Sequence, residues 1–323
     1  MIPIRDTTPS NNYPVINNSI IGINVVLYLI EMTHGMDINR FLFIYGLVPA
    51  RYSMPELSLH FTPFQQIFSV FSFMFLHGGF WHLLSNMWSL YIFGDNVEDR
   101  LGHVRYFFFY ILCGLTSGLS HLLFNLYSDV PVIGASGAIA GVMGAYLLLH
   151  PYSKILTLIP IIFIPWFVEI PAFFFLGFWF LMQFINAAGS HGGASNIAWW
   201  AHVGGFIFGM VFLKLFRSVP YMGFTDKIQH VTAKKKTHHL QVIRPVGLEH
   251  NNTLYGTMII TPYEAATGCS KLVNISWRFH KKFLRVNVPK GIKEDGILRL
   301  KGLGKQGDNG VAGDLLLKIN VSL

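Results

Sequence analysis

The sequence has little charge and almost no cysteine. Asp, Glu, Lys and Arg make up only 12% of its 323 residues, about half of the ~25% found in ordinary soluble domains. Its two cysteines, Cys113 and Cys269, lie in segments of opposite character and are not expected to pair. No paired-cysteine metal motif is present, and no cofactor is expected. Hydrophobic residues dominate at 52%, which favours a chain that lies partly in a lipid bilayer.

The apolar residues are concentrated in the first two thirds of the chain. Six lysines and arginines stand against nine aspartates and glutamates before Lys214, and eighteen stand against seven from there on. We therefore expect a membrane domain over 1–216, a basic linker over 217–239 and a soluble domain over 240–323. The run Lys234–Lys236 predicts attraction to the anionic headgroups of a lipid bilayer. A nucleic-acid partner is not expected, because aromatic stacking platforms and a known binding motif are missing.

We expect the membrane domain to be all-α, with six transmembrane helices. Several of the apolar stretches are shorter than the ~20 residues that cross a bilayer alone. Short stretches suit helices that begin inside a water-accessible cavity. The expected spans are Ile16–Met32, Trp81–Phe93 with an extension to Glu98, Val104–Leu126, Ser136–His150, Ala172–Ala187 and Ala198–Phe216.

Two apolar segments between these spans are not counted as helices that cross the membrane. His34–Phe80 is too broken for one helix and too apolar for an ordinary loop, so we expect it half-buried at the interface. Pro151–Pro171 contains Pro160 and Pro165, which break helices, among β-formers. We predict an extended interfacial connection there. The alternative, a seventh span, would place the C-terminal domain on the other side of the membrane.

Lysine and arginine are unevenly distributed over the two sides of a six-span arrangement. One side has only Arg40 and Arg51. The richer side is expected to face the cytoplasm, so both termini are predicted to be cytoplasmic. That richer side carries Arg5, Arg100, Arg105, Lys154 and the tail from Lys214.

The C-terminal domain is predicted to be a small all-β fold. Glycines and prolines punctuate its apolar and β-branched runs, and Pro262–Ala266 is expected to form one helical turn. The expected strands are Leu254–Thr261, Ser270–Trp277, Phe283–Val288 and Leu315–Val321.

A serine and a histidine stand out within the expected spans. Ser136 begins an apolar, small-residue helix after Gly134, and His202 lies near the start of the last span. Serine at a helix start is most often a simple cap, and a histidine in an apolar span is either bonded to a neighbouring helix or functional. Together they form the smallest activated nucleophile, a serine beside a general base. No carboxylate partner is evident, so a dyad is favoured over a triad.

Regularly spaced glycines on these two helices favour close packing between them. Small residues at four-residue spacing let membrane helices approach backbone to backbone. We predict that this contact brings Ser136 and His202 within hydrogen-bond reach. The glycines concerned are Gly137, Gly141 and Gly144 on one helix and Gly205 and Gly209 on the other.

His82 and Asn86 are four residues apart, and so share one helix face. Both can donate hydrogen bonds to the carbonyl oxygen that becomes negative during amide hydrolysis. The alternative is that they hold helices together.

Several segments of the first 215 or so residues resemble the rhomboid family of intramembrane serine proteases. The resemblance implies Ser136 as nucleophile, His202 as general base, and Asn86 and His82 with the Ser136 N–H as oxyanion donors. Some members stack a tyrosine on the histidine from one turn after the serine, but this chain has Ala140 there, so another group must orient His202. The segments are Met1–Asp6, Gly46–Ala50, His77–Met87, Glu98–Gly102, Gly134–Gly137, and His202 with Gly205 and Gly209.

Residues 254–323 resemble one β-domain of the client-binding C-terminal region of DnaJ-type co-chaperones. The resemblance implies binding of extended or unfolded peptide. No J-domain His-Pro-Asp and no cysteine-rich module is present, so recruitment of an Hsp70-type ATPase is not expected. The alternative is a domain that only stabilises. The carrying segments are Thr261–Gly268, Val288–Ile292, Leu298–Gly304 and Gly313–Leu315.

These observations predict a rhomboid-type serine endopeptidase in a bacterial inner membrane, which hydrolyses peptide bonds in or beside the transmembrane helices of its substrates. The alternative is a non-cleaving protein that binds membrane clients or guides quality control. Such a relative is expected to lack Ser136 or His202, or to block the serine with bulky neighbours, whereas Ala135 and Gly137 flank it here.

Overall fold

The computed structural model divides the chain into two units, Met1–Lys234 and Lys235–Leu323, which are described separately. It describes all residues except a set of short segments. Most of the expected linker therefore lies outside the described residues. The segments left out are 9, 162–163, 190–196, 219–231, 233–239, 244, 248–251, 278–279, 307–311 and 323.

Helices occupy all six positions at which spans were expected. Among the described residues, α1, α7, α9 and α10 are long and apolar enough to cross a membrane. A fifth span is counted only if the segments Pro63–Phe75 and Phe80–Leu101, bent by 73°, are taken together, and Ser136–Leu149 is a shorter apolar helix. The expectation of six spans is therefore met in position but not fully in length. The helices are α1 (Val15–Met32), α6 (Phe80–Leu101), α7 (His103–Phe124), α8 (Ser136–Leu149), α9 (Ala172–Gly189) and α10 (Trp199–Ser218).

The broken segment between α1 and α6 folds into short helices. Thr62 and Gln65 form a capping box that starts α5. Arg51 is buried, and its guanidinium donates to the carbonyl oxygens of Phe43 and Ile44, which satisfies backbone groups that the short helices leave free. The elements are η1 (Gly35–Asp37), α2 (Ile38–Tyr45), α3 (Ala50–Ser53), α4 (Pro55–Ser58), α5 (Pro63–Ser72) and η2 (Phe73–Phe75).

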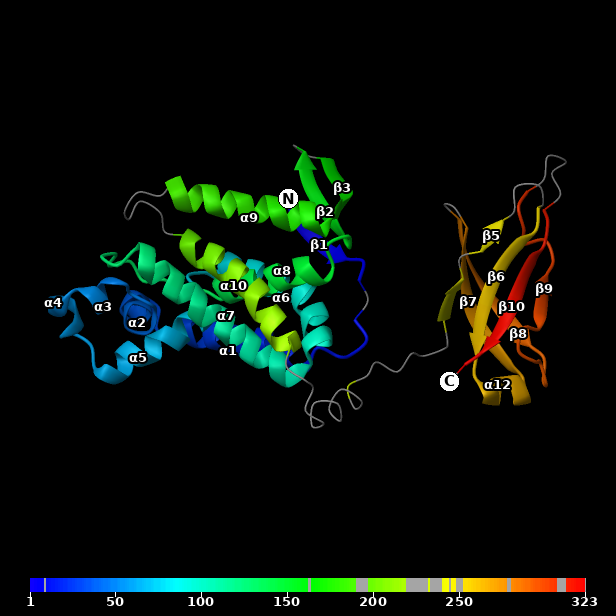
Figure 1. Ribbon diagram of the computed structural model, residues 1–323, viewed down its shortest axis with the longest axis horizontal. Helices are drawn as coiled ribbons and strands as arrows, with labels where there is room; N and C mark the ends of the chain where they lie inside the picture. Colours follow the sequence, from blue (N-terminus) through cyan, green and yellow to red (C-terminus); the bar gives the residue numbers. More distant parts are fainter. Residues whose placement is uncertain are drawn as a thin grey trace. The chain divides into compact units, whose positions relative to one another are not determined.

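The proline-containing stretch after α8 is extended, as predicted. β2 (Lys154–Ile161) and β3 (Ile164–Pro171) pair as an antiparallel hairpin. A third strand, β1 (Ile2–Asp6), was not predicted; it adds to β2, with Ile2 opposite Leu158. The membrane unit therefore contains a three-stranded sheet besides its helices, and Figure 1 shows it at the start of α9.

α8 is the central helix of the first unit and packs against α6, α7 and α10. The predicted glycine contact between α8 and α10 is confirmed. A Cβ added to Gly209 would lie 2.2 Å from the carbonyl oxygen of Gly141, and one added to Gly144 would lie 2.3 Å from that of Phe206. Only glycine permits such backbone contact.

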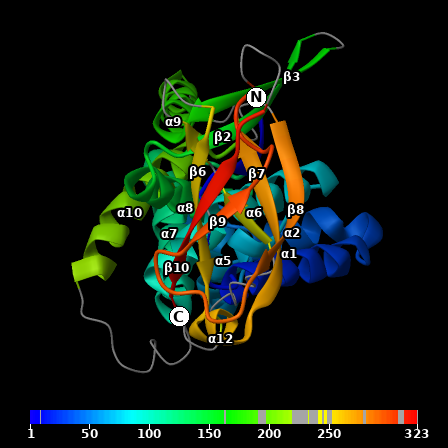
Figure 2. The ribbon, with the colours of Figure 1, turned by 90° about the vertical axis from the view of Figure 1, so that its right-hand side faces the viewer.

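Among its described residues, the second unit contains two β-sheets and one short helix. Figure 2 shows the strands of this unit. One sheet has the order β5-β6-β10-β9, in which β6 and β10 are parallel, and the other has the order β4-β7-β8. The four expected strands and the helical turn, now α12 (Pro262–Thr267), are present. Strands β4, β5 and β9 were not expected. The strands are β4 (Leu240–Ile243), β5 (Val246–Gly247), β6 (Leu254–Ile260), β7 (Cys269–Trp277), β8 (His280–Val288), β9 (Ile297–Leu300) and β10 (Leu315–Val321).

Candidate active site

Ser136 is the first residue of α8, and the backbone before it is shaped by a glycine. Gly134 has a φ of +122°, a conformation that side chains disfavour. Its N–H donates to the carbonyl oxygen of Phe73 at 2.8 Å. A Cβ at Gly134 would lie 2.7 Å from Nε2 of His82, so glycine also keeps the space beside that imidazole open.

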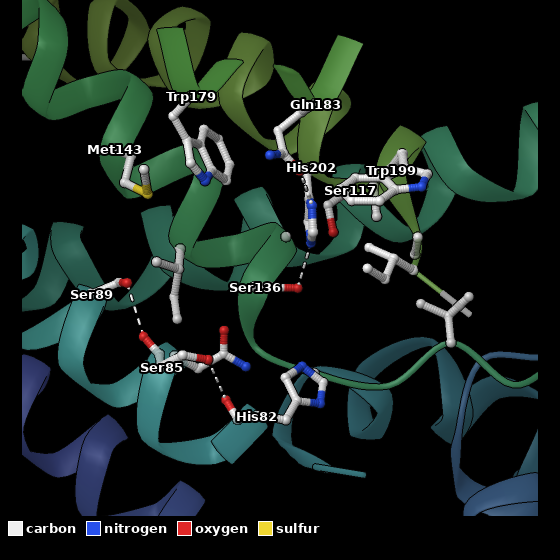
Figure 3. A pocket seen from close by; sticks show the side chains of 18 of the residues that line it. His82, Ser85, Ser89, Ser117, Ser136, Met143, Trp179, Gln183, Trp199 and His202 are labelled. Atoms are coloured by element: carbon white, nitrogen blue, oxygen red, sulfur yellow. Dashed lines mark hydrogen bonds between the residues drawn. The ribbon is translucent and has the colours of Figure 1, made fainter. Parts of the chain in front are cut away.

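His202 lies in the first turn of α10, directly against Ser136. The imidazole Nε2 is 2.8 Å from the serine Oγ, and Figure 3 marks this contact with a dashed line. The glycine contact between α8 and α10 explains why two residues 66 positions apart can come so close. The structure therefore brings together the serine and histidine that the sequence singled out.

Gln183 of α9 is a site residue that the sequence analysis missed. Its Oε1 is 2.8 Å from Nδ1 of His202, on the ring edge away from Ser136 (Figure 3). Trp179 and Trp199 flank the imidazole, with ring centroids 6.0 and 6.2 Å from it. These groups, and not a side chain at Ala140, contact the His202 ring. A signal existed, because a glutamine on the buried face of a phenylalanine-rich helix is costly without a partner.

Asn86 and His82 lie in the first two turns of α6. Asn86 is buried, and its Nδ2 has no hydrogen-bond partner among the described residues. A buried amide donor without a partner is uncommon and is suited to a group that arrives later. His82 is half-buried, and its ring centroid is 5.2 Å from that of His77.

One cavity of about 580 Å³ contains all these groups. Its lining includes Ser136, His202, Gln183, Asn86 and His82. Figure 3 shows the His82 imidazole on the opposite side of Ser136 from His202. Within the described parts of the chain, no cluster of His, Cys, Asp and Glu is suited to hold a metal ion.

Two buried carboxylates, Glu98 and Glu31, do not line the cavity but connect α1 to the segment that carries Asn86. The Glu98 carboxylate accepts the backbone N–H groups of Ile16 and Asn17 at 2.9 and 2.8 Å, which satisfies the start of α1. The Glu31 carboxylate accepts the backbone N–H of His77 at 3.1 and 3.2 Å. These contacts fix α1 to both ends of the segment that carries Asn86.

Apolar helices of membrane-spanning length, with a hydrogen-bonded serine and histidine between them, define an integral membrane protein with a polar site among its helices. Comparison with known families then identifies its parts. Residues 65–218 match the rhomboid domain, and residues 221–323 match the DnaJ C terminal domain. The chain therefore contains a rhomboid domain followed by a DnaJ C-terminal domain.

Individual relatives agree with this assignment. The chain is 30% identical to rhomboid protein 1, mitochondrial, of Saccharomyces cerevisiae over 198 residues, which cover 60% of this chain and 51% of the yeast protein. It is 40% identical to RHOMBOID-like protein 5 of Arabidopsis thaliana over 76 residues, covering 24% and 25%. It is 39% identical to rhomboid protease GluP of Bacillus subtilis over 72 residues, covering 22% and 14%. The chain thus spans about half or less of the length of these relatives.

Proposed function

We propose that this protein is an intramembrane serine endopeptidase that uses Ser136 and His202 as a catalytic dyad. The observation that carries the proposal is the 2.8 Å contact between His202 Nε2 and Ser136 Oγ inside a cavity bordered by apolar helices. The names of relatives such as rhomboid protease GluP support the reaction class.

The geometry suits acyl transfer. Ser136 Oγ attacks the scissile carbonyl carbon while His202 Nε2 takes the hydroxyl proton. The Asn86 amide, His82 and the Ser136 N–H donate to the carbonyl oxygen as it becomes negative. His202 then gives its proton to the departing amine, and an acyl-enzyme remains. A water molecule, deprotonated by His202, hydrolyses this ester and restores the serine.

The substrates are proposed to be membrane proteins with a helix that can open. A transmembrane helix satisfies its own backbone hydrogen bonds, so its carbonyl groups are not accessible to Ser136. A peptide bond in, or beside, a locally unwound stretch is therefore the proposed target.

Incubation of purified protein with a labelled single-span substrate in detergent tests this function. We expect a cut in or next to the apolar segment, mapped by mass spectrometry, and no cut with Ser136→Ala. The substitution removes one hydroxyl from a small-residue helix, so the fold should persist. Turnover at the wild-type rate by Ser136→Ala would exclude the dyad. Capture of substrates without any cut would favour the alternative, a client-binding protein.

For the second unit we propose a role in holding extended peptide. The match of 221–323 to the DnaJ C terminal domain supports this, and sheet edges such as β8 and β9 can add a further strand. We further propose that both termini lie in the cytoplasm, as the distribution of lysine and arginine favours. Tethering would then raise the local concentration of a substrate's cytoplasmic segment.

A further inference from the structure

Gln183 is out of place in its helix unless it has a specific partner. α9 carries two polar amides, Gln183 and Asn186, among apolar and aromatic residues. Asn186 is exposed and donates to Met182 of its own helix at 2.7 Å. Gln183 is only 8% exposed and reaches across to α10. An amide buried between membrane helices needs a hydrogen-bond partner, and Gln183 has its partner in His202.

The hydrogen bond with Gln183 determines which nitrogen of the His202 imidazole carries the proton. A neutral imidazole has one N–H donor and one acceptor nitrogen, and the partner of one nitrogen decides which is which. Gln183 Oε1 can only accept, so Nδ1 must carry the proton. Nε2 then presents its lone pair to Ser136 Oγ. The opposite tautomer would point an N–H at the serine and could not take its proton.

We propose that Gln183 is the positioning residue of the dyad, selecting the Nδ1–H tautomer of His202 and fixing the orientation of its ring. The inference rests on the proposed proteolytic function for its kinetic consequence, but not for the tautomer itself. Gln183 does not touch the reacting atoms; it acts through His202.

A neutral amide is a suitable partner at this depth. A carboxylate in the same place would also accept from Nδ1–H, but its desolvation in an apolar surrounding would lower the stability of the protein. Trp179 and Trp199 add steric limits on the ring, with interplanar angles of 37° and 87° to it. The aromatic pair restricts the tilt of the imidazole, while the hydrogen bonds at Nδ1 and Nε2 fix its rotation.

The kinetic test compares isosteric variants in the full-length protein. Gln183→Met keeps the side-chain length but removes the acceptor, and it should lower kcat with KM unchanged. We expect a loss of about 10–100-fold, the scale seen when a histidine that binds a metal loses the partner of its other nitrogen. Gln183→Glu retains an acceptor oxygen and should restore most of the lost rate. Asn186→Leu, the matched loss of an amide from the exposed face of α9, should cleave like wild type. Equal losses in the Met and Glu variants would assign Gln183 to packing and overturn the proposal.

The tautomer is measured without any substrate. Long-range ¹⁵N–¹H NMR of histidine-labelled protein distinguishes the two forms, and the His202 signal is assigned by its loss in His202→Ala. We expect the Nδ1–H form in wild type and Gln183→Glu, and a mixture in Gln183→Met. An unchanged tautomer in Gln183→Met would overturn the proposal. If wild type cleaves nothing yet shows this pattern, the proposed function fails and the positioning role stands.

Discussion

Gly205 of α10 lies so close to Gly137 of α8 that a Cβ added to Gly205 would be 2.0 Å from the Gly137 carbonyl oxygen. Gly137 directly follows Ser136, and Gly205 is three residues after His202. The distance between Ser136 and His202 is therefore set by a backbone contact between two helices rather than by the reach of flexible side chains.

Gly205→Ala should disturb both stability and activity. The methyl group forces α8 and α10 apart, and overpacking of this kind costs about 1–3 kcal/mol. Thermal unfolding in detergent and the cleavage rate should both fall. Gly177→Ala is the matched control, because a Cβ at Gly177 meets nothing within 4 Å. Equal melting temperatures for the two variants would contradict the assigned contact.

Asn86→Ala should slow cleavage more than it weakens substrate binding. The Nδ2 group is buried and without a partner among the described residues. It is proposed to donate a hydrogen bond to the carbonyl oxygen, which becomes negative only in the transition state. Removing such a donor typically costs about 10²–10³ in kcat. Steady-state kinetics measures the effect. A rise in KM alone would instead assign Asn86 to packing.

The topology proposal has a direct test in cells. A protease added outside intact cells should not reach the residues after Lys214, because both termini are proposed to be cytoplasmic. The same protease should digest the tail once the membrane is opened. Digestion of the tail from outside would contradict a cytoplasmic C-terminus.

An ion pair in the second unit should make its stability depend on pH. Burial raises the pKa of Glu264, but hydrogen bonds from Lys271 and from the Thr261 N–H outweigh burial and hold this pKa below its usual range. A lowered carboxyl pKa gives stability that is present above the unfolded value, about 4.3, and is lost as the pH falls through the folded value.

Hydrogen-exchange protection of β6 and β7 in the full-length protein should therefore decrease at acidic pH. Lys271→Met should lower that protection at neutral pH and flatten its pH dependence. Lys318→Met is the control, since its pair with Asp295 is 58% and 66% exposed and exposed pairs contribute little. The same pH dependence in Lys271→Met as in wild type would disprove the assignment.

Deletion of 240–323 should separate the two proposed activities. Cleavage of a bare transmembrane peptide should be unchanged, because the dyad and its cavity lie in the first unit. Substrates with long cytoplasmic segments should be cut more slowly, since they lose the tethered binding domain. Equal slowing of both substrates would indicate a domain that only stabilises.

The sequence was most informative at the contact between α8 and α10, where the residues that set the packing lie beside the polar site residues. The glycines on two apolar helices predicted the contact between α8 and α10, and with it the approach of Ser136 to His202. It was least informative where partners are distant in the chain. Nothing local in Ile2–Asp6 indicates that it pairs with β2, and Ile297–Leu300 is too short to be recognised as a strand without β10 beside it.

Gln183 shows a different limit of sequence reasoning. Its polarity within α9 was visible, but the partner depends on how α9 rotates and where it packs on α10. The bend of 73° between the α5 segment and α6 is a second feature that no local sequence pattern predicted.

The pairing of Ile2 with Leu158 has a consequence for biosynthesis. The first strand leaves the ribosome long before its partner exists. At synthesis rates of about 5–20 residues per second, it waits roughly 8–30 s. During that time its backbone groups must be satisfied by water, lipid headgroups or a chaperone. The sheet can therefore be completed only late in synthesis, after α1, α6, α7 and α8 have been made. Its formation joins the N-terminal strand to the middle of the membrane unit.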